Sequence, residues 1–120
     1  AVDAHHIYER KLFKDGGYYL ENGASVCEEH HLEAELLHTF RYQGAQSVAY
    51  NTIVAGGPNA CVLHHRAGYA ELKDGDLCLI DAGCELDGYA SDITRTFPIN
   101  GKFSGAQKAI YEIVLNFALA

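Results

Sequence analysis

The sequence predicts an α+β fold in which helices accompany antiparallel strand pairs. Three observations support this prediction. Asp87-Gly88 separates two apolar, strand-like runs, a capping pattern at Ser25 precedes apolar residues at helical spacing, and a second apolar stripe follows Ser104. A chain of 120 residues hides only about two thirds of its unfolded surface, so it forms one domain or part of one.

The first two dozen residues have the weakest pattern. Asp3 to Lys14 fit a helix with Ile7 and Lys11 on its surface, but they also fit a short hairpin that turns at residues 15–17. Of these two structures we favour the helix.

A helix is predicted from Ser25 to about Gly44. Ser25 and Glu28 have the spacing of a capping box, and Glu28 and Glu29 would lie near the positive end of the helix dipole. Apolar residues then recur at helical spacing: Leu32, Leu36, Leu37 and Phe40.

Two hairpins are predicted next. Residues 48–54 read as extended, residues 56–59 as a turn, and residues 61–64 as the returning strand, which would put His65 on the surface. A turn at residues 73–76 then leads into the second hairpin, which we call the central hairpin.

The turn at Asp87-Gly88 sets the register of the central hairpin, because both residues accept the positive φ of a type I′ turn. Three cross-strand pairs follow: Leu86 with Tyr89, Gly83 with Asp92, and Asp81 with Thr94. Asp81 and Asp92 then share one face as diagonal neighbours, roughly 7–8 Å apart. A one-residue bulge would place them on opposite faces.

Two carboxylates aimed at one point indicate a cation site. A lone aspartate in a strand is usually a turn or edge residue, but Asp81 follows a run that reads as buried, where an unpaired charge is costly. Hard divalent ions such as Mn²⁺ prefer carboxylate ligands. We therefore predict that Asp81 and Asp92 are metal ligands.

The last element is a helix that Ser104 and Gln107 cap, after a strand that ends at Phe97-Pro98 and a turn at Asn100-Gly101. It has no glycine or proline stop signal before Ala120, so we expect the chain to be cut inside a longer protein. Its apolar stripe contains the following residues: Ala106, Ala109, Ile110, Ile113, Val114 and Phe117.

The charge and the cysteine content limit the possible classes of function. A formal charge of −7 argues against nucleic-acid or membrane-surface binding, which needs a basic face. No apolar run is long enough to span a bilayer, and no signal leader opens the chain. The scattered cysteines do not demand a disulfide. We expect a soluble, cytoplasmic protein.

Several motifs resemble those of the pita-bread metallopeptidases, and most closely the Xaa-Pro aminopeptidase (aminopeptidase P) branch. The resemblance runs from about Leu32 to Leu115, while residues 1–24 match poorly. It implies that residues 1–120 are the first half of a pita-bread catalytic domain, with helices packed on a curved antiparallel sheet. The matching motifs are Tyr50-Asn51-Thr52-Ile53-Val54, Leu63-His64, Asp81-Ala82-Gly83, Gly88-Tyr89 and residues 91–97.

The resemblance also implies the chemistry. The whole protein would be a dinuclear, manganese-dependent enzyme that hydrolyses the bond between a first residue and a following proline. Asp81 would bridge the metals or chelate one of them, and Asp92 would bind both. Thr94 and Tyr89 would support these ligands, and His64 would contact the peptide substrate.

The remaining ligands in that family are one histidine and two glutamates from the second half of the domain. We therefore expect the 120-residue chain alone to be inactive, and to form a homo-oligomer that buries its apolar stripe. Two alternatives stay open. One is a prolidase or methionine aminopeptidase of the same fold, and the other is a pita-bread protein that has lost catalysis and binds peptides or proteins.

Overall fold

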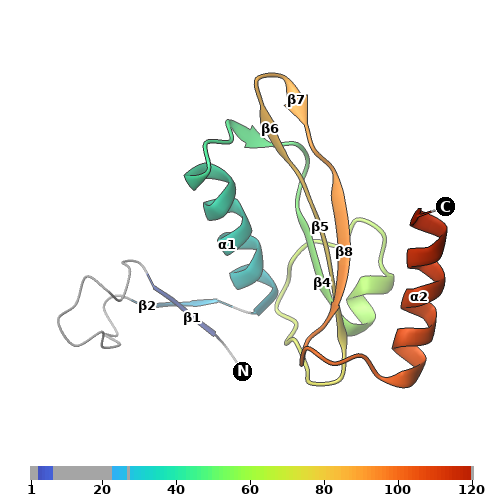
Figure 1. Ribbon diagram of the computed structural model, residues 1–120. Coiled ribbons are helices and arrows are strands. Elements are labelled where there is room, and N and C mark those ends of the chain that lie inside the picture. The colour runs from blue at the N-terminus through green and yellow to red at the C-terminus, as the bar shows by residue number, and fades with distance from the viewer. Residues whose placement is uncertain (1–2, 7–22, 27, 120) are drawn as a thin grey trace.

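The computed structural model describes residues 3–6, 23–26 and 28–119 (Figure 1). Strand β1 (Asp3–His6) pairs antiparallel with β2 (Gly23–Val26). The predicted helix from Asp3 is therefore wrong for these four residues, whose backbone forms a ladder with a distant segment. The remainder of that prediction, and the alternative turn at residues 15–17, lie outside the described residues.

Helix α1 (Glu28–Tyr42) confirms the predicted helix but not its start. Ser25 pairs with Ala4 in the β1–β2 ladder, so the capping box predicted there is wrong. The end of the helix agrees with the sequence, because Gly44 has φ +99 and its amide donates to the carbonyl of Arg41 at 3.1 Å. The Arg41 guanidinium also donates to the carbonyl of Gln46.

The main sheet has the strand order β4-β5-β8, formed by β4 (Ile53–Gly56), β5 (Leu77–Ala82) and β8 (Ile93–Pro98). All three strands are antiparallel. Helix α1 packs against β4, and Figure 1 places α2 (Gly105–Leu119) beyond β8. The buried apolar residues lie in the two strands nearest α1: Val54, Ala55, Cys78 and Ala82.

The first predicted hairpin is wrong, because β4 pairs with β5 rather than with residues 61–64. The chain after β4 forms the 3₁₀ helix η3 (Gly57–Cys61), in which Pro58 occupies the first turn. Proline has no amide proton for a strand ladder and fits the start of a helix. Leu63, expected in a strand, is 86% exposed.

The central hairpin has the predicted register. Asp87 (φ 52) and Gly88 (φ 83) both have positive φ, as a type I′ turn requires. Strands β6 (Cys84–Leu86) and β7 (Tyr89–Ala90) continue the hairpin to its tip, where β3 (Ser47–Val48) pairs with β6. The observed pairs show no bulge and include Leu86 with Tyr89, Glu85 with Ala90, Ala82 with Ile93, and Asp81 with Thr94.

Helix α2 confirms the predicted capping box. The Gln107 side chain accepts from the Ser104 amide at 2.8 Å, and the Gln107 amide donates to the Ser104 hydroxyl at 3.3 Å. Gln107 also donates to the carbonyl of Gly75 at 2.8 Å, which ties the helix to the turn before β5. No residue of α2 is buried. No helix in the described part of the chain is long and apolar enough to cross a membrane.

Candidate metal centre

Asp81 and Asp92 point to the same place, as the register of the central hairpin predicts. Asp81 lies near the end of β5, and Asp92 directly precedes β8. Both carboxylates meet the hydroxyl of Tyr50, which lies 2.5 Å from Asp81 Oδ1 and 3.0 Å from Asp92 Oδ1. The prediction that the two acids share one side of the hairpin, with Thr94 opposite Asp81, is confirmed.

The Tyr50 hydroxyl cannot satisfy both carboxylates. Burial, followed by the hydrogen bonds to Asp81 and Asp92, raises the pKa of Tyr50 above its ordinary value of 10.0, so the phenol keeps its proton at neutral pH. A phenol has one proton to donate. Within the part of the chain that the structure describes, the Tyr50 proton can therefore satisfy only one of the two contacted oxygens, and two negative charges lie within reach of one hydroxyl. This donor set fits a hard divalent cation.

The same carboxylates open onto a cavity of about 360 Å³. His64 lies in its wall, where the turn after η3 holds the residue with φ +56. The two predicted ligands and the predicted substrate-binding histidine are thus brought together. The lining residues are Tyr50, Asn51, Ile53, His64, His65, Arg66, Asp81 and Asp92.

The two predicted supporting residues have different positions. Thr94 faces Asp81 across the β5–β8 ladder, so it lies beside the candidate ligands. Tyr89 lies at the hairpin tip, is 83% exposed, and does not line the cavity. Strand alternation also places Tyr89 on the opposite face from Asp92. Tyr50, which sequence reasoning noted only as part of a motif, contacts the carboxylates instead.

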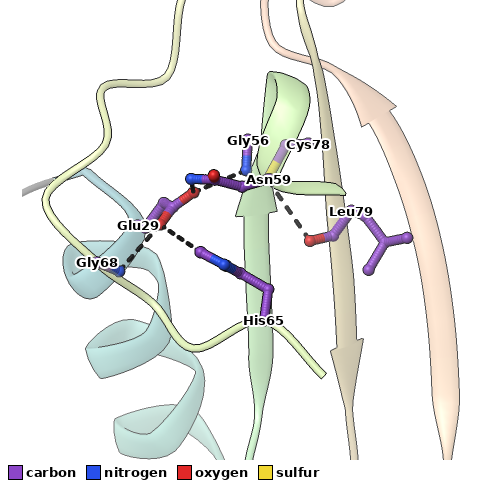
Figure 2. A network of polar contacts seen from close by, with 7 residues as sticks. All are labelled: Glu29, Gly56, Asn59, His65, Gly68, Cys78 and Leu79. Carbon is purple, nitrogen blue, oxygen red and sulfur yellow. Dashed lines mark hydrogen bonds and ion pairs between the residues drawn. The ribbon is translucent and has the colours of Figure 1, made fainter. Parts of the chain in front are cut away.

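Sequence reasoning missed a buried carboxylate beside this cavity. The Glu29 side chain is fully buried at the start of α1, and four groups donate to it (Figure 2). Oε1 accepts from the Gly56 amide at 2.9 Å and from Asn59 Nδ2 at 3.1 Å. Oε2 accepts from the Gly68 amide at 3.0 Å and lies 3.0 Å from His65 Nε2.

These contacts determine the charge state of Glu29. Burial alone would raise its pKa, but hydrogen bonds from Gly56, His65, Asn59 and Gly68 outweigh burial and lower the pKa below its ordinary value of 4.5. The prediction that His65 is a surface residue is wrong, because its ring contacts this carboxylate.

No local signal in the sequence indicated this network. A glutamate in the first turn of a helix is usually explained by the helix dipole. The partners of Glu29 lie 27 to 39 positions further along the chain. Among the residues that the structure describes, no group of three or more histidines, cysteines, aspartates or glutamates could hold a metal ion. Asp81 and Asp92 therefore supply only part of a coordination sphere.

Comparisons with known proteins agree with this geometry. The sequence model of metallopeptidase family M24 matches residues 3–120. The Xaa-Pro aminopeptidase of Escherichia coli is 60% identical over 87 residues, which cover 72% of this chain and 20% of that protein. The chain therefore spans about a fifth of the length of this relative.

Two solved structures share the fold of the matched region. Pseudomonas aeruginosa aminopeptidase PepP is 67% identical with a TM-score of 0.71. Zinc-substituted Escherichia coli aminopeptidase P in complex with product is 59% identical with a TM-score of 0.70. Each match covers 73% of this chain and 20% of the other. Since these are aminopeptidase P structures, the predicted α+β, pita-bread fold is confirmed for a partial domain.

Proposed function

Because this chain belongs to metallopeptidase family M24, we propose that the protein containing it is a metal-dependent Xaa-Pro aminopeptidase. The observation that carries the proposal is the convergence of Asp81 and Asp92 on one point of a cavity that also contains His64. The identity to Xaa-Pro aminopeptidases supports the substrate class, a peptide with proline in second position.

In this proposal Asp81 and Asp92 are the metal ligands that this chain provides. Two divalent ions, most simply Mn²⁺, would supply Lewis-acid activation of the attacking water. A carboxylate in β5 and one directly before β8 suit such ions, because the β5–β8 ladder holds the two segments side by side. The remaining ligands would come from outside the described residues.

Residues in and beside the cavity act on the ligands and the substrate. The Tyr50 hydroxyl holds the two carboxylates together from the protein side. Thr94 lies beside Asp81 and would keep that ligand in its orientation. The His64 imidazole would donate a hydrogen bond to the carbonyl oxygen of the scissile bond, where negative charge develops during hydrolysis. The exposed Tyr89 has no role in this scheme.

A substrate panel tests the proposal in the full-length protein. Metal is removed with a chelator and either Mn²⁺, Zn²⁺ or Mg²⁺ is added back. We expect metal-dependent release of the first residue from an Xaa-Pro tripeptide and little release from the matched Xaa-Ala peptide. Preference for an Xaa-Pro dipeptide would indicate a prolidase, and preference for Met-Ala peptides a methionine aminopeptidase. Metal-independent peptide binding without cleavage would indicate a non-catalytic protein.

The proposal also includes a cytoplasmic location, which agrees with the free thiols of Cys61, Cys78 and Cys84. Cell fractionation of the tagged full-length protein tests it. Recovery in a membrane or secreted fraction would contradict this part of the proposal.

A further inference from the structure

The segment between β4 and β5 carries one wall of the candidate site but has little regular structure of its own. After η3 it continues as turn and coil through residues 62–76. It presents three cavity residues in succession, His64, His65 and Arg66. Within its first part the backbone bonds are local, from Val62 to Asn59 and from His65 to Val62. Contacts from outside the segment can therefore contribute to holding it over the cavity.

Glu29 makes the contacts that could do so. Its Oε1 accepts from Gly56 at the end of β4 and from Asn59 in η3. Its Oε2 accepts from His65 and Gly68 further along the segment (Figure 2). One side chain of α1 thus joins the start and the later part of the segment. Hydrogen bonds to a charged acceptor are among the strongest in proteins.

The charge of Glu29 also fixes the state of His65. An ionised carboxylate only accepts hydrogen bonds, so His65 Nε2 must carry a proton. A neutral His65 ring then has an unprotonated Nδ1, which can accept a hydrogen bond. Glu29 therefore determines both the position of the ring and the tautomer of the histidine next to His64.

We propose that Glu29 is a positioning residue for the candidate active site: its buried carboxylate clamps the segment of residues 56–68 onto α1 and so holds His64 and His65 in the substrate wall of the cavity. This inference rests on the proposed function. The two parts of the site would then be held in different ways. Glu29 holds the segment with His64 and His65, whereas the β5–β8 ladder holds Asp81 and the start of β8 next to Asp92.

Glu29→Gln in the full-length protein is the main test. Glutamine keeps the size of the side chain, but its amide NH₂ would face donors at Gly68 and His65. We expect kcat/KM for an Xaa-Pro peptide to fall between about 10- and 100-fold, mainly through kcat, because a displacement of about 1 Å can cost up to that much in rate. Bound divalent metal should stay at the wild-type level. Glu29→Asp keeps the charge but is one methylene shorter, so it should recover only part of the loss.

Four further variants separate positioning from folding. His65→Gln should reproduce most of the loss in kcat/KM, and the double variant Glu29→Gln/His65→Gln should add little to either single change. Asn59→Ala removes one donor and leaves the carboxylate paired, so it keeps the inference testable if Glu29→Gln does not fold. Glu35→Gln is the matched control, an exposed glutamate on the same helix, and should leave kcat/KM unchanged.

The outcomes are distinct. Lower thermal stability with unchanged KM and kcat would overturn the inference and leave Glu29 a structural residue. Metal loss in Glu29→Gln equal to that in Asp92→Asn would also overturn it. An inactive wild-type enzyme would overturn the proposed function instead. In that case, hydrogen–deuterium exchange of residues 57–68 still decides whether Glu29 holds the segment: faster exchange in Glu29→Gln supports the clamp, and unchanged exchange overturns it.

Discussion

Glu29 is buried, Asp81 is half-buried and Asp92 is exposed, and the hydrogen bonds of these three carboxylates distinguish two roles. Glu29 receives four donors from the protein, so its charge is compensated without any ligand. Asp81 and Asp92 share a single phenolic proton. A carboxylate pair with one shared protein donor leaves oxygens free to bind a cation, whereas a buried carboxylate with four donors serves structure.

This distinction predicts different effects for two substitutions in the full-length enzyme. Asp92→Asn should lose bound metal and nearly all peptidase activity, because an amide is a neutral and weaker ligand for a hard cation. His64→Ala should retain metal and lower turnover, since the proposed role of His64 is toward the substrate. Metal analysis and steady-state kinetics on both variants provide the check. Equal metal loss in both would make His64 a ligand.

The lowered pKa of Glu29 predicts a pH-dependent contribution to stability. A carboxylate with a lower pKa in the folded state stabilises the fold fully above its unfolded pKa, here about 4.5, and less as pH falls through its folded pKa. Thermal unfolding of wild type and Glu29→Gln from pH 3 to pH 7 measures this. The wild type should be more stable at pH 7, and the difference should shrink below about pH 4.5. A constant difference would contradict an ionised Glu29.

At the scale of elements, two features set by short stretches of sequence were predicted correctly. The type I′ turn at Asp87-Gly88 fixed the register of the central hairpin, and Ser104 identified the start of α2. The partner of β4 was not predictable, because pairing of Ile53 with Asp81 depends on contacts between distant segments. For the same reason the sequence indicated Asp81 and Asp92, which one hairpin brings together, but not Glu29.

Gly83 provides an element-scale prediction. A Cβ atom there would lie 1.8 Å from the carbonyl oxygen of Ser91, so the two strands of the central hairpin would have to separate. Gly83→Ala should destabilise the full-length protein by about 1–3 kcal/mol and weaken metal binding by moving Asp81 relative to Asp92. Gly105→Ala is the control, because no atom lies near its Cβ position at the start of α2. Thermal unfolding and metal titration measure both, and equal effects would contradict this role for Gly83.

At the scale of the whole molecule, the described residues leave a large apolar surface uncovered. Phe117 is 82% exposed and Ile110 is 64% exposed, both on the stripe of α2. An amphipathic helix normally buries such a stripe against another layer. The chain also spans only about a fifth of the relatives that it matches. The exposed stripe and the incomplete ligand set therefore both bear on how the 120-residue chain behaves when it is produced alone.

We expect this chain, produced by itself, to associate and to lack peptidase activity. The α2 stripe favours association because exposed apolar patches of this kind drive it. A symmetric dimer would bring two copies of Asp81 and Asp92 together and could bind a cation. It should not cleave Xaa-Pro peptides, because the described residues of each copy supply only these two carboxylates to the candidate metal centre. Sedimentation, with an assay containing Mn²⁺ and an Xaa-Pro peptide, tests both claims. A monomer would contradict the association, and metal-dependent turnover would show that the site of this chain is complete.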